Sequence, residues 1–402
     1  RKRCRLVEVQ VTGENQDDHH GSKHTRTNPG FLLEYKEYRD FRNDDGRKLE
    51  IELEKDGLIV ISHIQFYDNV SVVRFWTELR NESESTKGIE YVSSFALTGI
   101  EKERLQCWSE TSRLHVPHNT WYGEMQWRTY SLPELGLSPV NYVTLKRIGY
   151  NSQGTWSSSE LLPMGCFENL ESRSALMWQI EHNGSWHWEL GEQAEHLYIQ
   201  LSGPSENESH WWKELKSGES FTSVTAAVGV SCDFEKAVVE LTKYRRLIRR
   251  ENDDNKKLPV IFNDYANCLD GDPTTEKLIP LIDAAAEVGC EIFCIDAGWY
   301  SDGDWWDGVG EWLPSNVRFP GGIEEPLNYI RSKGMIPGLW LEIEVIGIHC
   351  PLAEKCPDDW FFVRHGKRIV DHGRYQLNFR NPEVVRYADQ VVDRLVNEYG
   401  IG

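Results

Sequence analysis

The stretch CEIFCIDAGWYSDGDWWDG, residues 290–308, decides the fold of this chain. It begins with a short apolar run that ends at Asp296, and a glycine and three tryptophans follow. A short apolar run bounded by glycine is typical of a strand buried in a sheet. Two further runs of this kind, LPVIFNDY at 258–265 and MIPGLWLEIE at 335–344, predict one strand before it and one after it.

A predicted helix follows each of these three strands. The helical segments are residues 274–289, 321–334 and 381–400, and each ends on a glycine. Successive strand–helix units predict parallel strands with both faces of the sheet covered. A doubly wound sheet and a (β/α)8 barrel both fit this order. The long insertions after the second and third strands favour the TIM barrel, of which the chain would hold the first three β/α units.

The part of the chain before these units has the pattern of a β domain. The stretches LEIELEKDGLIVISHIQFYD, residues 49–68, and VSVVRFWTELRN, residues 70–81, alternate apolar and polar residues. Turn signals such as Asp56-Gly57 and Asn183-Gly184 separate the predicted strands. The sequence therefore predicts three parts: residues 1–235 as a large antiparallel β-sandwich or barrel, 236–257 as a helical linker, and 258–402 as an incomplete barrel.

Composition limits the kinds of partner. A net charge of -20 argues against nucleic acid or an anionic membrane surface. The chain has no run of about 18 apolar residues, which a membrane-spanning helix needs. The nine cysteines are an odd number without CxxC spacing, and we predict reduced thiols in a cytoplasmic protein rather than zinc ligands.

Acidic side chains stand at the end of all three predicted strands, namely Asp264, Asp296 and the pair Glu342 and Glu344. In parallel α/β folds the carboxyl ends of the strands face the ligand. A carboxylate accepts hydrogen bonds from sugar hydroxyls, and a tryptophan offers a face for stacking. The pattern therefore predicts a carbohydrate site. The alternative is a set of helix-capping carboxylates with structural tryptophans.

With these residues in view, the chain resembles glycoside hydrolase family 36, the α-galactosidase and α-N-acetylgalactosaminidase family. The resembling stretches include NDYANCLDGDPTTEKL, EIFCIDAGWY, GEWLPSNVRFPGGI, GMIPGLWLEIEV and RYQLNFRNPEVV, in this order along residues 258–402. Upstream, GENQDDHHGSKHT, SSSELLPMGCFENL and WWKELKSGESF also look like the family. The resemblance thus covers nearly the whole chain.

The resemblance implies a multidomain protein with an N-terminal antiparallel β-supersandwich, a (β/α)8 barrel and a C-terminal β domain. It also implies a retaining exo-glycosidase that removes terminal α-galactoside-type sugars and uses neither a metal nor an organic cofactor. The family's nucleophilic aspartate lies in a Lys-x-Asp motif on the fourth barrel strand, and its acid/base aspartate lies further on. We expect both beyond residue 402, so that no catalytic residue is assigned here and this chain alone would be inactive.

By the same resemblance, five residues are expected to hold the substrate. Asp296 would bind hydroxyls around C4, and Trp340 would line the galactose site. Arg374 would reach a sugar hydroxyl, unless it is an ordinary surface arginine. Trp299 is expected as either a contact or a core residue, and Asp264 as either a supporting or subsite residue or a cap. The resemblance leaves a homo-oligomer open, because relatives commonly assemble.

One departure from the family makes the substrate uncertain. The usual motif on the second strand is Asp-Asp-Gly-Trp, whereas this chain has Ala297 at the second acid, which normally grips the C6 hydroxyl. Either another residue supplies that contact, or the sugar differs at C6, as in an arabinopyranoside. The hypotheses are therefore an α-galactosidase, an α-N-acetylgalactosaminidase or arabinopyranosidase, a transglycosylase with the same intermediate, and a non-catalytic carbohydrate-binding fragment.

Overall fold

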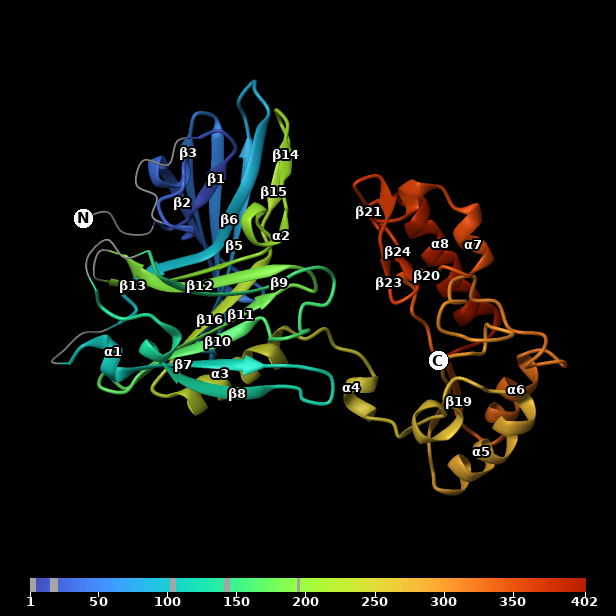
Figure 1. Cartoon of the computed structure of the whole chain (residues 1–402). Coiled ribbons are helices and arrows are strands. Elements are labelled where there is room, and N and C mark those ends of the chain that lie inside the picture. The colour runs from blue at the N-terminus through green and yellow to red at the C-terminus, as the bar shows by residue number, and fades with distance from the viewer. Residues whose placement is uncertain (1–4, 15–20, 102–105, 141–144, 194–195) are drawn as a thin grey trace. The chain divides into compact units, whose positions relative to one another are not determined.

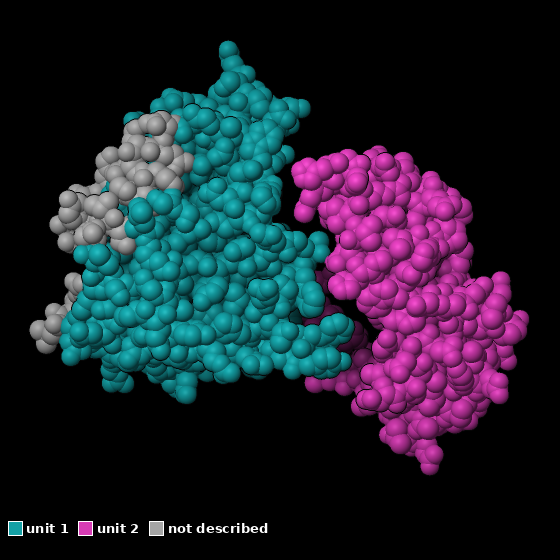
Figure 2. Space-filling view, in the orientation of Figure 1, with its two compact units in different colours: residues 1–249 teal, residues 250–402 magenta. Residues whose placement is uncertain are grey.

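The computed structural model describes residues 5–14, 21–101, 106–140, 145–193 and 196–402. The chain forms two compact units, residues 1–249 and residues 250–402, which are coloured separately in Figure 2. No helix among the described residues is long and apolar enough to cross a membrane. The eight cysteines of the described ranges are free thiols, and Cys4 lies outside them, as do residues 15–20 of the stretch GENQDDHHGSKHT.

The first unit consists of two antiparallel sheets (Figure 1). The smaller sheet has six strands: β1 (Val9–Val11), β6 (Lys87–Thr98), β9 (Arg147–Ser152), β12 (Trp186–Gln193), β13 (His196–Ser202) and β14 (Lys213–Leu215). The larger sheet has ten: β2 (Glu34–Asn43), β3 (Gly46–Lys55), β4 (Leu58–Phe66), β5 (Val72–Asn81), β7 (Ser112–His118), β8 (Gln126–Ser131), β10 (Met164–Asn169), β11 (Ser174–Glu181), β15 (Ser220–Thr222) and β16 (Thr225–Ser231). These strands confirm the antiparallel β-sandwich.

The core of the sandwich contains the buried side chains of both sheets. One cluster joins residues such as Trp178 of β11 and Trp188 of β12, whose rings pack edge to face at 5.0 Å. A second cluster contains Val9, Val60 and Ile89. Since alternate residues of a strand point to opposite faces, each sheet contributes one apolar row to this interior.

Short helices and one long helix complete the first unit: η1 (Gly30–Leu32), α1 (Trp108–Thr111), η2 (Pro133–Leu135), α2 (Glu206–Ser209) and α3 (Phe234–Ile248). Helix α3 begins at Asp233, whose side chain accepts a hydrogen bond from the Lys236 amide. Its buried face, which includes Leu241 and Tyr244, packs with residues of β10, β11 and β16.

This packing corrects the predicted linker of residues 236–257. Most of that segment is α3, which belongs to the first unit because its apolar face is covered by the larger sheet. The division between the units falls at residue 249 instead of residue 235. The rest of the predicted linker contains α4 (Asp254–Lys257), which belongs to the second unit.

The second unit is built on a parallel sheet of three strands, β17 (Ile261–Asn263), β18 (Ile292–Ile295) and β19 (Ile336–Leu339), with β18 in the middle. The helices predicted after them are α5 (Thr275–Glu287), α6 (Glu324–Ser332) and α8 (Pro382–Asp393). The remaining elements are η3 (Tyr265–Leu269), β20 (Val345–Gly347), α7 (Pro351–Lys355), η4 (Asp358–Trp360), β21 (Val363–Arg364), β22 (Lys367–Arg368), β23 (Val370–Asp371), β24 (Arg374–Gln376) and η5 (Arg394–Glu398). The three predicted strand–helix units are therefore present, and closure into a barrel goes beyond what these strands show.

Helices cover one face of this sheet. Phe293 and Ile295 of β18 are fully buried with the apolar faces of α5, α6 and α8. The residues between them, Ile292 and Cys294, point to the other face and are only half-buried. On that face the outer strands leave Ile261 59% and Ile336 48% exposed, so the expected coverage of both faces holds for one face of the described sheet.

Candidate functional site

Three polar or aromatic side chains share the open face of the parallel sheet at its carboxyl end. Asn263 pairs in register with Cys294. Asp296 and Trp340 come directly after β18 and β19, at the next positions that point the same way. The parallel register brings these residues together although the chain separates them by more than 30 positions each. The sequence predicted this grouping for Asp296 and Trp340.

Hydrogen bonds fix the carboxylate of Asp296. The Asn263 side-chain amide donates to Oδ2 at 2.6 Å, and the Ala297 backbone amide donates to Oδ1 at 2.6 Å. The Asp296 backbone amide in turn donates to Oδ1 of Asp264 at 2.7 Å. Each carboxylate oxygen of Asp296 keeps acceptor capacity beyond its one bond. The side chain is half-buried and is therefore oriented to accept further hydrogen bonds from a ligand.

Asp264 is buried beneath this carboxylate, with 2% of its surface exposed. No described residue donates a hydrogen bond to its second oxygen, Oδ2. Burial raises the pKa of Asp264 to about 6, and the nearby charge of Asp296 acts in the same direction. The contact of Asp264 goes to the backbone of Asp296, a position that is compatible with a supporting residue.

The raised pKa predicts a pH-dependent stability. Between about pH 4 and pH 6 the folded chain keeps the Asp264 proton that the unfolded chain releases, so stability falls as pH rises through this window. Asp264→Asn removes this titration and keeps an acceptor for the Asp296 amide. We expect the variant to match the wild type near pH 4 and to exceed it by about 1–3 kcal/mol at pH 7.5. Urea unfolding at both pH values measures this, with exposed Asp389→Asn as the control; an equal difference at both values would contradict it.

Trp340 is half-buried within a group of aromatic rings. Its ring centroid lies 5.7 Å from that of Trp305, 5.9 Å from that of Trp312 and 6.2 Å from that of Tyr300. A partly open indole held by other rings can offer its face to a sugar. The predicted lining role of Trp340 is compatible with this position.

Trp299 is a core residue, so its expectation as a contact is corrected. Its side chain is fully buried in the cluster that includes Phe293 and Trp312. Its indole N–H donates to the backbone oxygen of Trp340 at 3.0 Å. Trp299 therefore supports the backbone that carries Trp340, and it presents no surface to a ligand.

Arg374, at the start of β24, is a buried residue and not an ordinary surface arginine. It is 6% exposed, and its Nη1 donates to Oε1 of Glu342 at 2.8 Å. Its Nε donates to the backbone oxygen of Trp306 at 2.9 Å, and the guanidinium carbon lies 3.9 Å from the Trp306 ring centroid. Its Nη2 donates to no described residue. The guanidinium therefore joins β24, the segment after β19 and the tryptophan-rich loop.

The Tyr300 hydroxyl lies within electrostatic range of this ion pair and of Asp296. Burial raises its pKa far above the ordinary value, and the charges of Arg374, Glu342 and Asp296 all act on it. Burial also raises the pKa of Glu342, while Arg374 opposes that rise. The second unit thus gathers two carboxylates, one arginine and several aromatic rings around one region.

Sequence reasoning missed the partners that hold Arg374, namely Glu342 and Trp306, and gave Asn263 no role. Glu342 stood out only as a strand-end acid, and Trp306 only as part of a tryptophan-rich loop. For Glu342 and Trp306 the sequence offered a signal in the type of the residue and in its position at a strand end or in a loop. The contacts themselves depend on tertiary structure, because 32 and 68 positions separate the two residues from Arg374.

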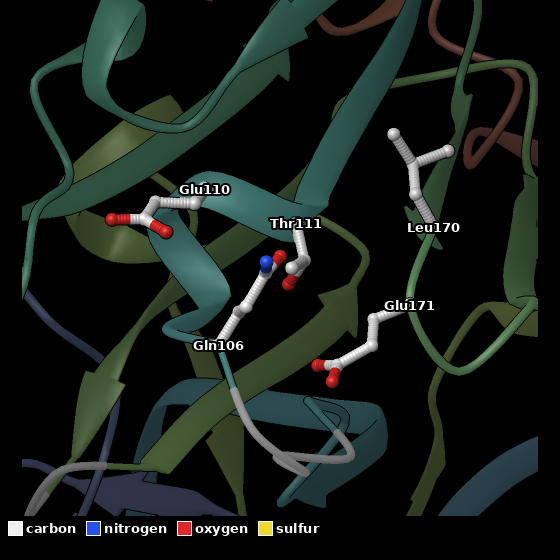
Figure 3. A pocket seen from close by; sticks show the side chains of 5 residues that line it. All are labelled: Gln106, Glu110, Thr111, Leu170 and Glu171. Carbon is white, nitrogen blue, oxygen red and sulfur yellow. The ribbon is translucent and has the colours of Figure 1, made fainter.

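Two further features lie in the first unit. A depression of about 340 Å³ near α1 is lined by Gln106, Glu110, Thr111, Leu170 and Glu171 (Figure 3), and it contains none of the predicted site residues. Separately, ligand atoms of the buried side chains His24, His187 and Glu189 lie within 4.8 Å of one another. Arg147 bonds to Glu189 and has Nη1 3.1 Å from Nε2 of His187, so that its positive charge already neutralises this group. These contacts favour a structural ion network over a metal centre.

A family model described as Melibiase matches residues 226–402. Among curated proteins, α-galactosidase 1 of Pediococcus pentosaceus is 27% identical over 193 residues, which make up 46% of this chain and 26% of that protein. The α-galactosidase of Escherichia coli is 30% identical over 151 residues, which make up 36% of this chain and 21% of that protein.

Solved structures resemble the chain over most of its length. The crystal structure of the GH36 α-galactosidase AgaA from Geobacillus stearothermophilus matches with a TM-score of 0.81 at 17% identity, covering 98% of this chain and 53% of that chain. An α-galactosidase from Lactobacillus brevis matches with a TM-score of 0.77 at 17% identity, covering 92% of this chain and 50% of that chain. At this identity the likeness concerns the fold. The chain spans about half the length of these structures.

Proposed function

Because this chain belongs to the glycoside hydrolase family 36 α-galactosidase family, we propose that the protein is a retaining exo-glycosidase that removes terminal α-galactoside-type sugars. The observation that carries the proposal is the oriented carboxylate of Asp296 beside Trp340 at the carboxyl end of a parallel sheet. Structures of AgaA variants with bound raffinose and stachyose support a carbohydrate ligand for this family.

Within this proposal the described residues bind and orient the sugar. Asp296 accepts hydrogen bonds from hydroxyls and Trp340 stacks against the apolar face of the ring. Arg374 donates to a hydroxyl through Nη2, which is buried and has no acceptor among the described residues, so this contact requires the site to open around it. In a retaining mechanism one carboxylate attacks the anomeric carbon, and a second carboxyl group protonates the leaving oxygen and then activates water. We assign both groups to residues that follow Gly402, on further strands of a (β/α)8 barrel.

Exposed apolar residues on the parallel sheet support such further strands. Ile261 of β17 and Ile336 of β19, on the two outer strands, point to the face that no helix of the described residues covers, and both are about half exposed. In a closed barrel this face turns inward and its apolar side chains fill the interior. The same closure would place Asp296 and Trp340 at the mouth of the barrel.

Ala297 favours a second candidate substrate. Its side chain is buried with 2% exposure and offers no hydrogen-bond acceptor at the position where, by the resemblance, the family motif has an acid for the C6 hydroxyl. A sugar that lacks this hydroxyl would lose no hydrogen bond at position 297. The second candidate is therefore an arabinopyranosidase activity, since a β-L-arabinopyranoside is an α-galactopyranoside without its C6 hydroxymethyl group.

The test compares residues 1–402 with a chain that continues along the same reading frame. We expect the longer chain to hydrolyse aryl α-galactosides or the matching arabinopyranoside, and residues 1–402 to show no turnover. In the longer chain Asp296→Asn should lower kcat/KM by about 10- to 150-fold, because a charged acceptor is worth about 1.5–3 kcal/mol. Asp389→Asn, on the exposed side of α8, should leave the rate unchanged.

Three outcomes would redirect the proposal. Turnover by residues 1–402 alone would contradict the location of the nucleophile. Sugar binding without turnover in the longer chain would favour a carbohydrate-binding protein. Transfer of the sugar to an added acceptor, instead of to water, would identify a transglycosylase with the same covalent intermediate.

A further inference from the structure

Three tryptophans follow β18, and their indole N–H groups are used differently. Trp299 donates to the backbone oxygen of Trp340 at 3.0 Å, and Trp306 donates to that of His372 at 2.6 Å. Among the described residues, the N–H of Trp305 has no acceptor. Its nitrogen is also not enclosed, so a ligand can reach it. Since an indole N–H can only donate, Trp305 keeps one hydrogen bond for a ligand.

Trp305 lies at the carboxyl end of the parallel sheet. Its ring centroid lies 5.7 Å from that of Tyr265, which follows β17, and 5.7 Å from that of Trp340, which follows β19. Both ring pairs pack edge to face, with interplanar angles of 88° and 80°. Strand β18 lies between β17 and β19, and Asp296 comes directly after it. The indole therefore spans the end of the sheet on which Asp296 lies.

The N–H of Trp305 lies on the side of the site that carries Ala297. The indole packs so closely on Gly271 that an added Cβ there would overlap with its nitrogen. The backbone oxygen of Gly271 packs in the same way on Gly298, which follows Ala297. The methyl group of Ala297 offers a ligand no hydrogen bond. The chain thus places a donor beside the position at which, by the resemblance, the family motif has an acid.

A buried arginine holds the loop that carries Trp305. Arg318 is 7% exposed, and its Nε donates to the backbone oxygen of Ser301 at 2.5 Å. Its Nη2 donates to the backbone oxygen of Gly303 at 2.9 Å, and its Nη1 pairs with Asp272. These contacts tie the loop to the segment after β17. A donor that is held in place before the ligand arrives loses little conformational freedom on binding.

From this placement we propose that Trp305 is a specificity-determining residue of the sugar site. Its indole N–H donates to the C6 hydroxyl of the sugar, the group that Ala297 cannot hold. Its ring extends the aromatic wall that Trp340 begins. The inference rests on the proposed glycosidase function and chooses between its two candidate substrates. A galactoside carries this hydroxyl and an arabinopyranoside does not, so the contact favours the galactoside.

The first test compares two aryl α-glycosides in the longer chain that continues along the same reading frame. The galactoside carries the C6 hydroxyl, and the α-D-fucoside is the same sugar without it. Trp305→Phe keeps an aromatic ring and removes the indole N–H. We expect this variant to lower kcat/KM for the galactoside by about 3- to 10-fold, as for one neutral hydrogen bond. Its kcat/KM for the fucoside should change by less than about twofold.

The ratio of the two kcat/KM values separates the contact from a folding defect, because a loss of folded enzyme lowers both values equally. Gly271→Ala keeps Trp305 in the chain and displaces its ring, since the added Cβ would overlap with the indole nitrogen. It should reduce the preference for the galactoside as Trp305→Phe does. Gly289→Ala is the matched control, because its φ of +83° equals the +82° of Gly271 within a degree, but an added Cβ there meets no atom within 4 Å. It should leave the ratio unchanged.

A binding measurement distinguishes failure of this inference from failure of the proposed function. Isothermal titration of the longer chain with galactose and with D-fucose measures the contact whether or not the chain turns over a glycoside. We expect Trp305→Phe to weaken galactose binding by about 3- to 10-fold and to leave D-fucose binding within about twofold of the wild type. A chain that binds both sugars but turns over neither contradicts the glycosidase, and the same comparison still decides the role of Trp305.

Any of four results would overturn the role of Trp305. A wild type without a preference for the galactoside over the fucoside makes no contact to the C6 hydroxyl. A Trp305→Phe chain that keeps the wild-type preference makes this contact through another residue. Faster turnover of the matching arabinopyranoside than of the galactoside would favour the second candidate substrate. A longer chain that binds none of these sugars would overturn the proposed function together with this inference.

Discussion

Gly298→Ala is expected to unfold the second unit. Gly298 has a φ of +98°, which L side chains rarely adopt, and an added Cβ would lie 2.0 Å from the backbone oxygen of Gly271. The obstacle is backbone, so no rotation of a side chain can relieve the overlap. Because Gly271 is in turn pressed against Trp305, its segment cannot retreat freely. We expect a loss of at least about 4 kcal/mol in the free energy of unfolding of this unit.

The measurement is urea unfolding followed by circular dichroism, in which we expect one transition for each of the two compact units. The transition of the second unit should shift strongly or disappear, while that of the sandwich stays in place. Gly303→Ala is the matched control in the same loop, because an added Cβ there meets no atom within 4 Å. A Gly298→Ala chain within about 1 kcal/mol of the wild type would show that the loop can move, and that the close approach is not needed.

The segment around Gly298 contains features that could be predicted from the sequence and one feature that could not. The run ending in Asp296, Ala297 and Gly298 predicted a strand end with a ligand-facing acid, and the structure has β18 ending at Ile295. The three strand–helix units were predictable because each combines an apolar run, a cap and a final glycine, which are local signals. The need for glycine at 298 was not predictable, because it arises from a contact with residue 271.

Long-range pairing limited the predictions in the sandwich as well. The Asp56-Gly57 turn joins β3 and β4, which are neighbours in one sheet, as a local hairpin would be. The Asn183-Gly184 turn has the same local signal, yet it joins β11 of the larger sheet to β12 of the smaller one. Turn residues set the local bend, but which strands pair depends on burial of faces that are distant in sequence.

The candidate site likewise has features that were predictable from the sequence and features that depend on tertiary contacts. The placement of Asp296 and Trp340 at neighbouring strand ends was predictable because parallel strands bring their carboxyl ends together, and their sugar-binding roles stay a prediction. The choice between contact and core for Trp299 depended on its neighbours, since it packs at 6.1 Å from Trp312 and donates to the Trp340 backbone. For Arg374 the resemblance predicted a functional position, but its burial against Trp306 and Glu342 emerged only from the fold.

Arg374→Met is expected to destabilise the second unit by about 3 kcal/mol. Methionine keeps much of the apolar stem that packs on Trp306, but it removes the positive charge beside Glu342 and the hydrogen bond to the Trp306 backbone. Breaking a buried ion pair costs about 3–5 kcal/mol because the remaining charge loses its partner. Glu342 is about a quarter exposed (24%), so the lower end of that range applies.

The loss should depend on pH, and the sign follows from Glu342. Burial already raises the pKa of Glu342 and Arg374 holds it down, so removing the arginine raises it further. A raised carboxyl pKa makes the folded state lose stability as pH rises above the ordinary value near 4.5. Arg374→Met should therefore cost less at pH 5, where Glu342 can take up a proton, than at pH 7.5.

The double variant Arg374→Met with Glu342→Gln isolates the interaction between the two charges. Glutamine has a similar shape and carries no charge, so the double variant should recover about 1–2 kcal/mol of the loss at pH 7.5 and little at pH 5. Arg386→Met, on the exposed surface of α8, is the control for removing an arginine from this unit. An equal loss at both pH values, or no recovery by Glu342→Gln, would mean that Arg374 stabilises the unit through its packing on Trp306 and not through its charge.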